Sequence, residues 1–295
     1  MRVATLLAAL LLGVGAFSGA RADVKFATVA PAARSFRVGA LSLTALHDSQ
    51  ISVANDGKIF GLGVSTSAVA NVLRAAGAPT DRITLSVNTL LVRTGRRLVL
   101  IDTGLGPQHD GALPGSLKLA GVSPGEVTDV LITHPHPDHI GGLLDAQGGL
   151  AFPNATIHMA SAAWAWMQQK VAPAMVRTVA PRIRTFAPGA KVAPGIVSVS
   201  LPGHTPGHVG YEIISGHSRL IDFGDLAHSS IVSLARPQWA IGFDNDQALG
   251  RKTRLETLPA LARSGEWVFA PHFPYPGVGR IVAAGRGFAW KPGLP

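Results

Sequence analysis

One short segment in the middle of the chain concentrates side chains that bind metals. The sequence THPHPDHIGG begins at Thr133 and places His134, His136, Asp138 and His139 within six positions. Imidazole nitrogen and carboxylate oxygen suit zinc, and they are also accepted by iron, manganese and cobalt. An isolated histidine often only hydrogen-bonds to nearby backbone, but packing rarely requires so dense a cluster. The spacing permits two ions, because alternate side chains of a loop can point toward different metals.

The surrounding pattern predicts that this cluster follows a buried strand. Residues Val127 to Thr133 are apolar and rich in β-branched side chains, and a helix is expected from Ile140 onward. Three further predicted strands end beside a candidate ligand: 197–201 before His204, 219–223 before Asp225, and 267–270 before His272. Asp225 could be a simple turn residue after Gly224. A strand that delivers a carboxylate beside a metal cluster favours ligation instead.

The remaining elements indicate the architecture. Strands are predicted at 36–47, 84–93, 97–102, 156–159 and 211–214, and helices at 117–120, 162–171 and 247–263. Tight turns at Thr94-Gly95 and at Gly216 predict two hairpins. The segment from Asp48 to Asp81 is expected to be irregular and could form a lid, and the tail from Lys291 is also expected to be irregular. Early hairpins followed by strands that alternate with helices favour two sheets with helices outside over a doubly wound parallel sheet.

The N-terminus has the pattern of a secretory signal peptide, predicted over residues 1–22. Arg2 supplies the positive region, Val3 to Phe17 the apolar region, and Ala20-Arg21-Ala22 a small-residue cleavage site. A membrane anchor is the alternative, but the apolar run is shorter than the roughly 20 residues that a bilayer requires. Cleavage near Ala22 would leave residues 23–295 as one domain that is periplasmic or secreted. No stable membrane insertion is expected.

Composition excludes several chemistries. The chain of 295 residues has no cysteine, which rules out thiolate ligands, thiol nucleophiles and iron–sulfur clusters. Its formal net charge is +9, but the basic residues are scattered, and the only adjacent pairs are Arg96-Arg97 and Arg251-Lys252. A nucleic-acid partner is therefore not expected. Any metal must be bound by nitrogen and oxygen.

The H-x-H-x-D-H run, with the later ligands in order, resembles the metallo-β-lactamase superfamily over essentially all of residues 23–295. This resemblance implies an α/β fold, an αββα sandwich of two mixed β-sheets flanked by helices, which would form the catalytic domain. It implies that His134, His136 and His204 bind one metal, that Asp138, His139 and His272 bind a second, and that Asp225 bridges them. Asp102, in the sequence IDTG, would steady the ligand loop, although it could also only cap a turn.

Four longer stretches are similar to the methyl parathion hydrolase branch, which is close to the lactonases. They are LPGHTPGH at 201–208, DFGDLAH at 222–228, GFDND at 242–246 and APHFPYPGVG at 270–279. The resemblance implies an exported enzyme with two zinc ions per chain, although the same ligands can also bind other divalent metals. Its small-molecule substrates would be lactones, aryl esters or organophosphate triesters. The branch also implies that the chain could form a homodimer through an N-terminal segment.

The predicted site implies hydrolysis without a protein nucleophile. Two metals that share Asp225 would share a water, lower its pKa toward neutrality and present hydroxide to a carbonyl carbon or phosphorus. Asp138 or Asp225 could take up the released proton. The pocket or the ligand surroundings could further include His208, His228, Trp164, Trp166, Phe273 and Tyr275. Aromatic residues near strand ends are, however, more often part of the core.

Other functions are compatible with parts of this pattern. A true β-lactamase of the secreted three-histidine type would lack the bridging aspartate that Asp225 supplies. Glyoxalase II and RNA-processing relatives share the ligands, but export argues against both. A non-catalytic periplasmic metal-binding protein is the alternative from a different class. The complete ligand set favours a hydrolase with two zinc ions, and the N-terminal pattern favours a secreted one, over these alternative functions.

Overall fold

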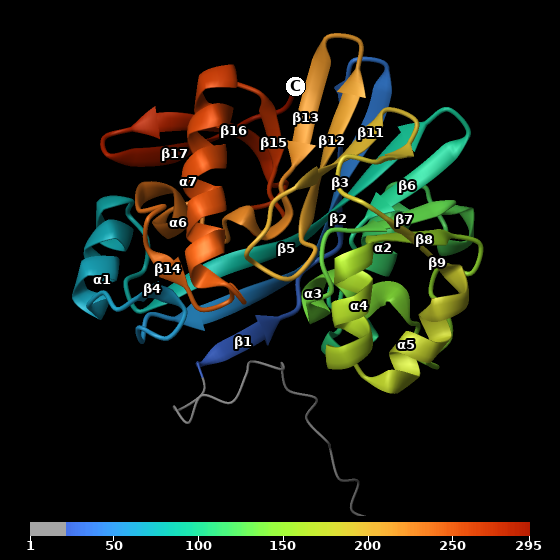
Figure 1. The fold of residues 1–295 in the computed structure, drawn as a ribbon, viewed down its shortest axis with the longest axis horizontal. Helices are drawn as coiled ribbons and strands as arrows, with labels where there is room; N and C mark the ends of the chain where they lie inside the picture. Colours follow the sequence, from blue (N-terminus) through green and yellow to red (C-terminus); the bar gives the residue numbers. More distant parts are fainter. Residues whose placement is uncertain (1–21) are drawn as a thin grey trace, which may run out of the picture.

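The computed structural model describes residues 22–295 and contains two large β-sheets with helices on their outer sides (Figure 1). The predicted αββα sandwich is therefore confirmed. The predicted signal peptide lies outside the described residues except for Ala22. Among the described residues, no helix is long and apolar enough to cross a membrane.

The first sheet carries the histidine cluster. Its strand order is β1-β3-β5-β6-β7-β8-β9, with β2 paired to β3. The strands are β1 (Val24–Ala27), β2 (Ala32–Val38), β3 (Leu41–Ala54), β5 (Arg82–Thr94), β6 (Arg97–Ile101), β7 (Asp129–Ile132), β8 (Thr156–Ala160) and β9 (Ile183–Phe186). Pairing is antiparallel from β1 to β6 and parallel from β6 to β9. All four residues of β7 are buried, as expected of a central parallel strand.

The second sheet supplies the other predicted ligands. Its order is β10-β11-β12-β13-β15-β16-β17. The strands are β10 (Lys191–Ala193), β11 (Ile196–Ser200), β12 (Val209–Ser215), β13 (Ser218–Asp222), β15 (Trp267–Phe269), β16 (Val278–Ala284) and β17 (Gly287–Pro292). Only the β13–β15 pair is parallel. A separate ribbon pairs β4 (Phe60–Leu62) with β14 (Ala240–Ile241).

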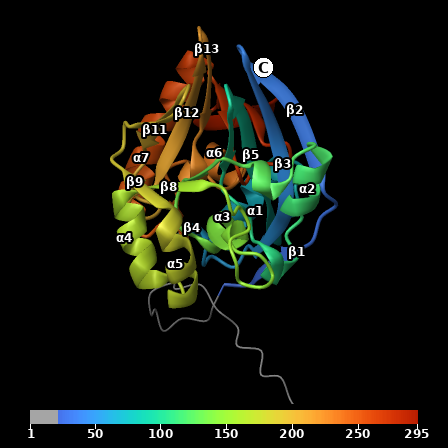
Figure 2. The same cartoon turned by 90° about the vertical axis from the view of Figure 1, so that its right-hand side faces the viewer.

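The helices connect the strands, and most of them lie on the outer sides of the sheets. They are α1 (Thr66–Ala75), α2 (Leu113–Leu119), α3 (Pro137–Ile140), α4 (Ser161–Lys170), α5 (Pro173–Val179), α6 (Val232–Ala235) and α7 (Gln247–Ser264). Helix α2 packs on β2 and β3, α4 packs on β8 and β9, and α7 packs on β16. Figure 2 shows α2 and α7 on opposite sides of the strands.

Apolar side chains from both sheets meet in one core. Leu90 of β5, Ile213 of β12 and Phe269 of β15 belong to the same buried cluster and are fully buried. Each such side chain stabilises the fold by about 1.5–3 kcal/mol relative to an exposed position. The two sheets are therefore held together by a shared apolar core.

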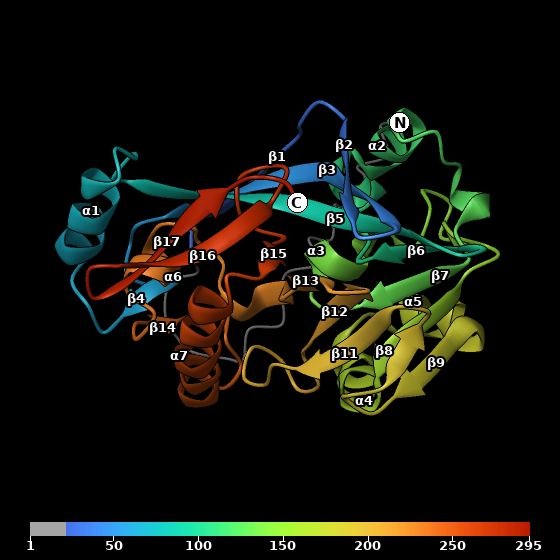
Figure 3. The ribbon, with the colours of Figure 1, turned by 90° about the horizontal axis from the view of Figure 1, so that it is seen from above.

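The segment from Asp48 to Asp81 is not irregular, so that prediction is wrong. Strand β3 continues through Ala54 in register with β5, and the two run side by side across the molecule (Figure 3). Helix α1 follows, and the Ser65 hydroxyl accepts the Ala68 N–H at its start. Asp48 itself is buried and accepts the N–H groups of Leu105 and Leu113, while burial raises its pKa to about 6. Residues 48–54 thus extend the first sheet, while β4 and α1 follow outside it.

Two other local predictions are wrong. The helix expected from Ile140 onward does not form. The single turn α3 ends at Ile140 and is followed by a 3₁₀ turn at Gly141–Leu143. Close backbone packing is the reason, because a Cβ on Gly141 would lie 2.2 Å from the Leu105 carbonyl oxygen. The tail is irregular only from residue 293, because Lys291 and Pro292 still belong to the edge strand β17, where Lys291 pairs with Arg280.

Candidate metal centre

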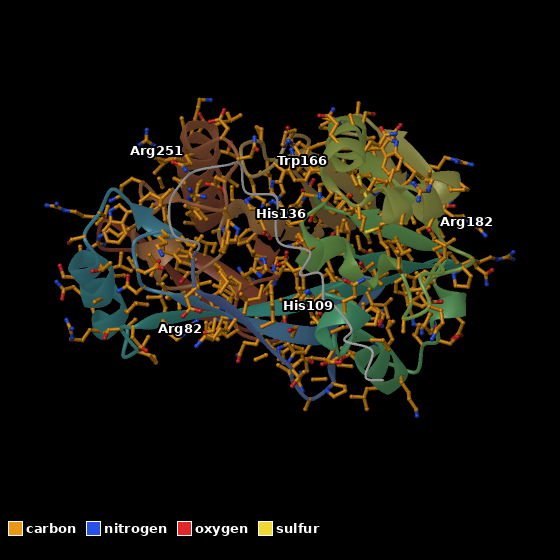
Figure 4. The ribbon with its side chains drawn as sticks, turned by 90° about the horizontal axis from the view of Figure 1, so that it is seen from below. Arg82, His109, His136, Trp166, Arg182 and Arg251 are labelled. Atoms are coloured by element: carbon orange, nitrogen blue, oxygen red, sulfur yellow. The ribbon has the colours of Figure 1, made fainter. Side chains whose placement is uncertain are left out.

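The seven predicted ligands come together where strands from both sheets end. His134 and His136 follow β7, and Asp138 and His139 lie on α3. His204 lies between β11 and β12, Asp225 follows β13, and His272 follows β15. Figure 4 shows His136 and Trp166 near one another in the middle of one face, and their ring centroids are 5.9 Å apart. The structure therefore assembles residues that are up to 138 positions apart.

The first group consists of His134, His136, His204 and Asp225, whose ligand atoms lie within 4.8 Å of one another. His204 Nε2 is 3.1 Å from His134 Nε2 and 2.9 Å from His136 Nδ1. Two ligands of a tetrahedral zinc, each about 2.1 Å from the ion, lie about 3.4 Å apart. Three imidazole nitrogens directed at one point thus fit a cation at their centre.

The second group consists of Asp138, His139 and His272. His272 Nε2 is 3.4 Å from Asp138 Oδ2, and His139 Nε2 is 3.6 Å from the same oxygen. His139 Nε2 is buried and has no hydrogen-bond partner among the described residues. A buried nitrogen without a partner is costly unless another ligand satisfies it. This donor set also fits a divalent cation.

Asp225 faces both groups. Its Oδ1 lies 3.2 Å from His139 Nε2, and its Oδ2 lies 3.3 Å from His204 Nε2. Burial would raise the pKa of this carboxyl, but the surrounding imidazoles of His272, His139 and His134 hold the pKa well below its usual value. Burial lowers the pKa of His134 and His136 well below the usual histidine value. The ionised carboxylate of Asp225 and the neutral imidazoles of His134 and His136 are the forms that bind metals. Burial also lowers the pKa of His204, but its hydrogen bonds to Asp225 and Asp244 outweigh burial and raise the pKa to about 9, so a bound metal would displace a proton from that ring.

Asp102 holds the ligand loop from behind. Its carboxylate accepts the Thr133 N–H at 2.9 Å and the Thr133 hydroxyl at 2.7 Å. Its Oδ2 also accepts a hydrogen bond from His139 Nδ1 at 2.8 Å, which directs His139 Nε2 toward Asp225. The residue has a φ of +59°, a conformation that costs a non-glycine residue about 1–3 kcal/mol. These contacts go beyond capping a turn.

His208 contacts the backbone of a predicted ligand. Its Nδ1 donates to the Leu201 carbonyl at 2.6 Å, and its Nε2 accepts the Asp225 N–H at 2.9 Å. Burial lowers the pKa of His208 to about 3, so the ring is neutral. Of the two roles considered from the sequence, pocket lining and ligand orientation, the contacts support the second.

We expect His208→Leu to weaken metal binding about 10–100-fold, the usual effect of losing a partner that orients a ligand. The leucine cannot accept the Asp225 N–H, whereas His208→Gln offers a carbonyl oxygen at a similar position and should retain most of the affinity. Zinc titration in competition with a chromogenic chelator measures both variants. Equal affinity of His208→Leu and wild type would rule out this orienting role.

His228 lies inside the cluster. Its Nε2 is 3.1 Å from Asp225 Oδ2, and its ring stacks on His272 with centroids 5.5 Å apart. Its other face approaches Phe243 at 5.2 Å. Burial lowers the pKa of His228 to about 4. The sequence interpretation of His228 as a neighbour of the ligands matches this position.

The aromatic residues predicted to line a pocket divide by position. Phe273 is fully buried between Phe223 and Trp290, which agrees with the alternative that it belongs to the core. Trp164 and Tyr275 pack against the main core. Trp166 lies beside His136. Among the ring contacts of residues 22–295, it is the one of these four aromatic residues that contacts a predicted ligand.

Two residues beside the centre were assigned no role from the sequence. Asp244 lies 3.1 Å from His204, and Arg254 pairs with Asp244 at 3.2 Å. The GFDND stretch contains Asp244 but does not indicate its partner. Arg254 lies on α7 without any motif, so its burial could not be read from the sequence.

Comparisons with known proteins agree with this geometry. The sequence model of the Metallo-beta-lactamase superfamily matches residues 82–272. A probable metallo-hydrolase of Mycobacterium tuberculosis is 28% identical over 186 residues, which cover 48% of this chain and 57% of the relative. The chain thus spans a little over half the length of that curated relative.

Two solved structures are similar over nearly their whole length. AidC, a dizinc quorum-quenching lactonase in complex with a product, has a TM-score of 0.83 and 27% identity, over 90% of this chain and 98% of that chain. The hydrolase AbOPH of the beta-lactamase superfamily has a TM-score of 0.81 and 28% identity, with the same coverage. The methyl parathion hydrolase branch itself stays a prediction. With its fold, its clustered histidines and aspartates and the family match, this chain belongs to the metallo-beta-lactamase superfamily.

Proposed function

We propose that this protein is an exported di-zinc hydrolase that opens lactones, with aryl esters and organophosphate triesters as further substrates. The observation that carries the proposal is Asp225, whose two oxygens face two adjacent groups of nitrogen and oxygen ligands. The similarity to AidC, a dizinc lactonase, favours lactones among these substrates. The N-terminal pattern of residues 1–22 supports export.

The chain's own residues have separate roles in this proposal. When bound, two zinc ions would supply a nucleophile at neutral pH and polarise the substrate oxygen. Asp225 fixes the two ligand groups beside one another and is 3% exposed, so it is shielded from solvent. The Asp138 side chain is 15% exposed, so its carboxylate is better placed to exchange a proton with solvent or substrate. Asp138 is therefore the stronger candidate for the proton acceptor.

The test is a substrate panel on the purified, metal-analysed protein. Initial rates are measured with an aliphatic lactone, an aryl ester, a phosphotriester and a cephalosporin, each with and without a chelator. We expect lactone turnover that the chelator abolishes and added zinc restores, with about two metals per chain. Turnover of the cephalosporin alone would instead assign a β-lactamase. Inertness toward all four with metal bound would support a metal-binding role.

A further inference from the structure

We propose that Asp244, just before α7, and Arg254, within α7, are positioning residues that set the geometry of the first ligand group. This inference rests on the metal centre of the proposed function but not on its substrate. Both side chains are buried, with 1% of each exposed. Neither belongs to the two ligand groups, so their burial requires another explanation.

Asp244 orients His204. Its Oδ1 is 3.1 Å from His204 Nδ1, and because a carboxylate oxygen can only accept, the Nδ1 must carry the proton. In the neutral ring, which is the form that binds metal, the lone pair is then on Nε2, which lies 3.1 Å from His134 Nε2 and 2.9 Å from His136 Nδ1. A carboxylate that fixes the tautomer and orientation of a ligating histidine is a common support of metal sites.

Arg254 connects this carboxylate to the loop that carries Asp225. One guanidinium nitrogen, Nη2, lies 3.2 Å from Asp244 Oδ2. Nη1 donates to the Leu226 carbonyl at 2.9 Å, and Nε donates to the Pro237 carbonyl at 3.2 Å. Because the guanidinium is planar and its donors have fixed directions, these three contacts hold the surroundings of His204 and Asp225 in one arrangement.

Backbone hydrogen bonds also join the segment before α7 to the turn that carries His204. The Asn245 N–H donates to the His204 carbonyl at 2.8 Å, and the Asp246 N–H donates to the Gly203 carbonyl at 2.9 Å. Gly203 has a φ of +124°, and a Cβ there would lie 2.1 Å from the Gly250 nitrogen of α7. The helix therefore packs directly against the turn that carries His204, and a shift of α7 must move this ligand.

The competing explanation is that this ion pair only stabilises the fold. The chain contains a control of the same residue types, in which Asp129 Oδ1 is 2.8 Å from Arg97 and 2.9 Å from His158. His158 belongs to neither ligand group, and the Asp129 side chain is 5% exposed. Arg97 is more exposed than Arg254, at 47%, so the two aspartates, rather than the arginines, form the matched pair.

The experiment compares Asp244→Ala with Asp129→Ala in the full-length protein. Competition with chelators gives the zinc dissociation constants of both sites, and the visible spectrum of the cobalt-substituted protein reports ligand geometry. We expect Asp244→Ala to raise one dissociation constant about 10–100-fold, to leave the other unchanged and to alter the cobalt spectrum. Asp129→Ala should change neither constant, even where it lowers the melting temperature. Arg254→Lys should raise the same constant by less, because lysine keeps the charge but not the three contacts.

Three results would overturn the inference. One is unchanged zinc constants in Asp244→Ala. A second is an equal weakening of both sites, and a third is the same change in Asp129→Ala. If Asp244→Ala does not fold, Asp244→Asn keeps an oxygen acceptor for His204 Nδ1 but loses the charge that pairs with Arg254, so it should raise the same single constant by less. No substrate is used, so failure of the lactone assay would leave this result standing.

Discussion

Replacing Asp225 with alanine is expected to lower kcat/KM by about 10³-fold and to reduce bound metal below two ions per chain. The carboxylate faces both ligand groups, so its loss removes a ligand that the two groups share. Metal-assisted hydrolysis depends on several kcal/mol of charge stabilisation, and about 4 kcal/mol corresponds to about 10³-fold in rate. Steady-state kinetics and elemental analysis of the same preparation measure both effects.

Asp129→Ala is the control for this substitution, because it removes a mostly buried carboxylate with a histidine partner away from the ligand groups. It should keep the activity and the metal content of the wild type. Wild-type activity and metal content in Asp225→Ala would mean that Asp225 is only a turn residue after Gly224.

Removal of metal should abolish activity and lower the melting temperature by about 10 °C. The predicted ligands are mostly buried, and their nitrogens face one another at distances such as 2.9 Å, which a cation stabilises. Metal at about 1,000 times its Kd adds about 4 kcal/mol of stability, and each kcal/mol shifts Tm by about 2–4 °C in a domain of this approximate size. Calorimetry before and after chelation measures the change.

Adding metal back after chelation distinguishes a specific metal centre from a general effect of cations. Zinc should restore both Tm and activity, whereas magnesium should restore neither, because magnesium prefers oxygen ligands and the groups here are rich in imidazole. A melting temperature that does not respond to chelation, or that magnesium restores as fully as zinc, would contradict the assignment of a transition-metal centre.

Three of the ligand histidines are held by the same kind of hydrogen bond, from Nδ1 to an acceptor oxygen. His139 and His204 direct Nδ1 toward the carboxylates of Asp102 and Asp244, and His272 directs Nδ1 toward the Ser86 carbonyl at 2.8 Å. Each acceptor oxygen requires the proton on Nδ1, which leaves Nε2 free to face the centre. The geometry of the centre therefore depends on residues that are themselves outside the ligand groups.

The local parts of the site could be predicted from the order of residues. His134, His136, Asp138 and His139 are neighbours in the chain, so their proximity follows from spacing after an apolar strand. The fold class followed from the order of hairpins and helices, and the family match confirms it. These inferences depend on periodicity and on adjacent residues, which a single sequence displays directly.

Only the tertiary structure decided which distant residues meet. Strand β3 beyond Asp48 was missed because its partner β5 lies about 30 residues further along the chain. The burial of Phe273 and the joining of Arg254, Asp244 and His204 depend on how the second sheet packs against α7. A side chain's burial and its partner are properties of the packed sheets and helices, because contacts between distant segments leave no local pattern in the sequence.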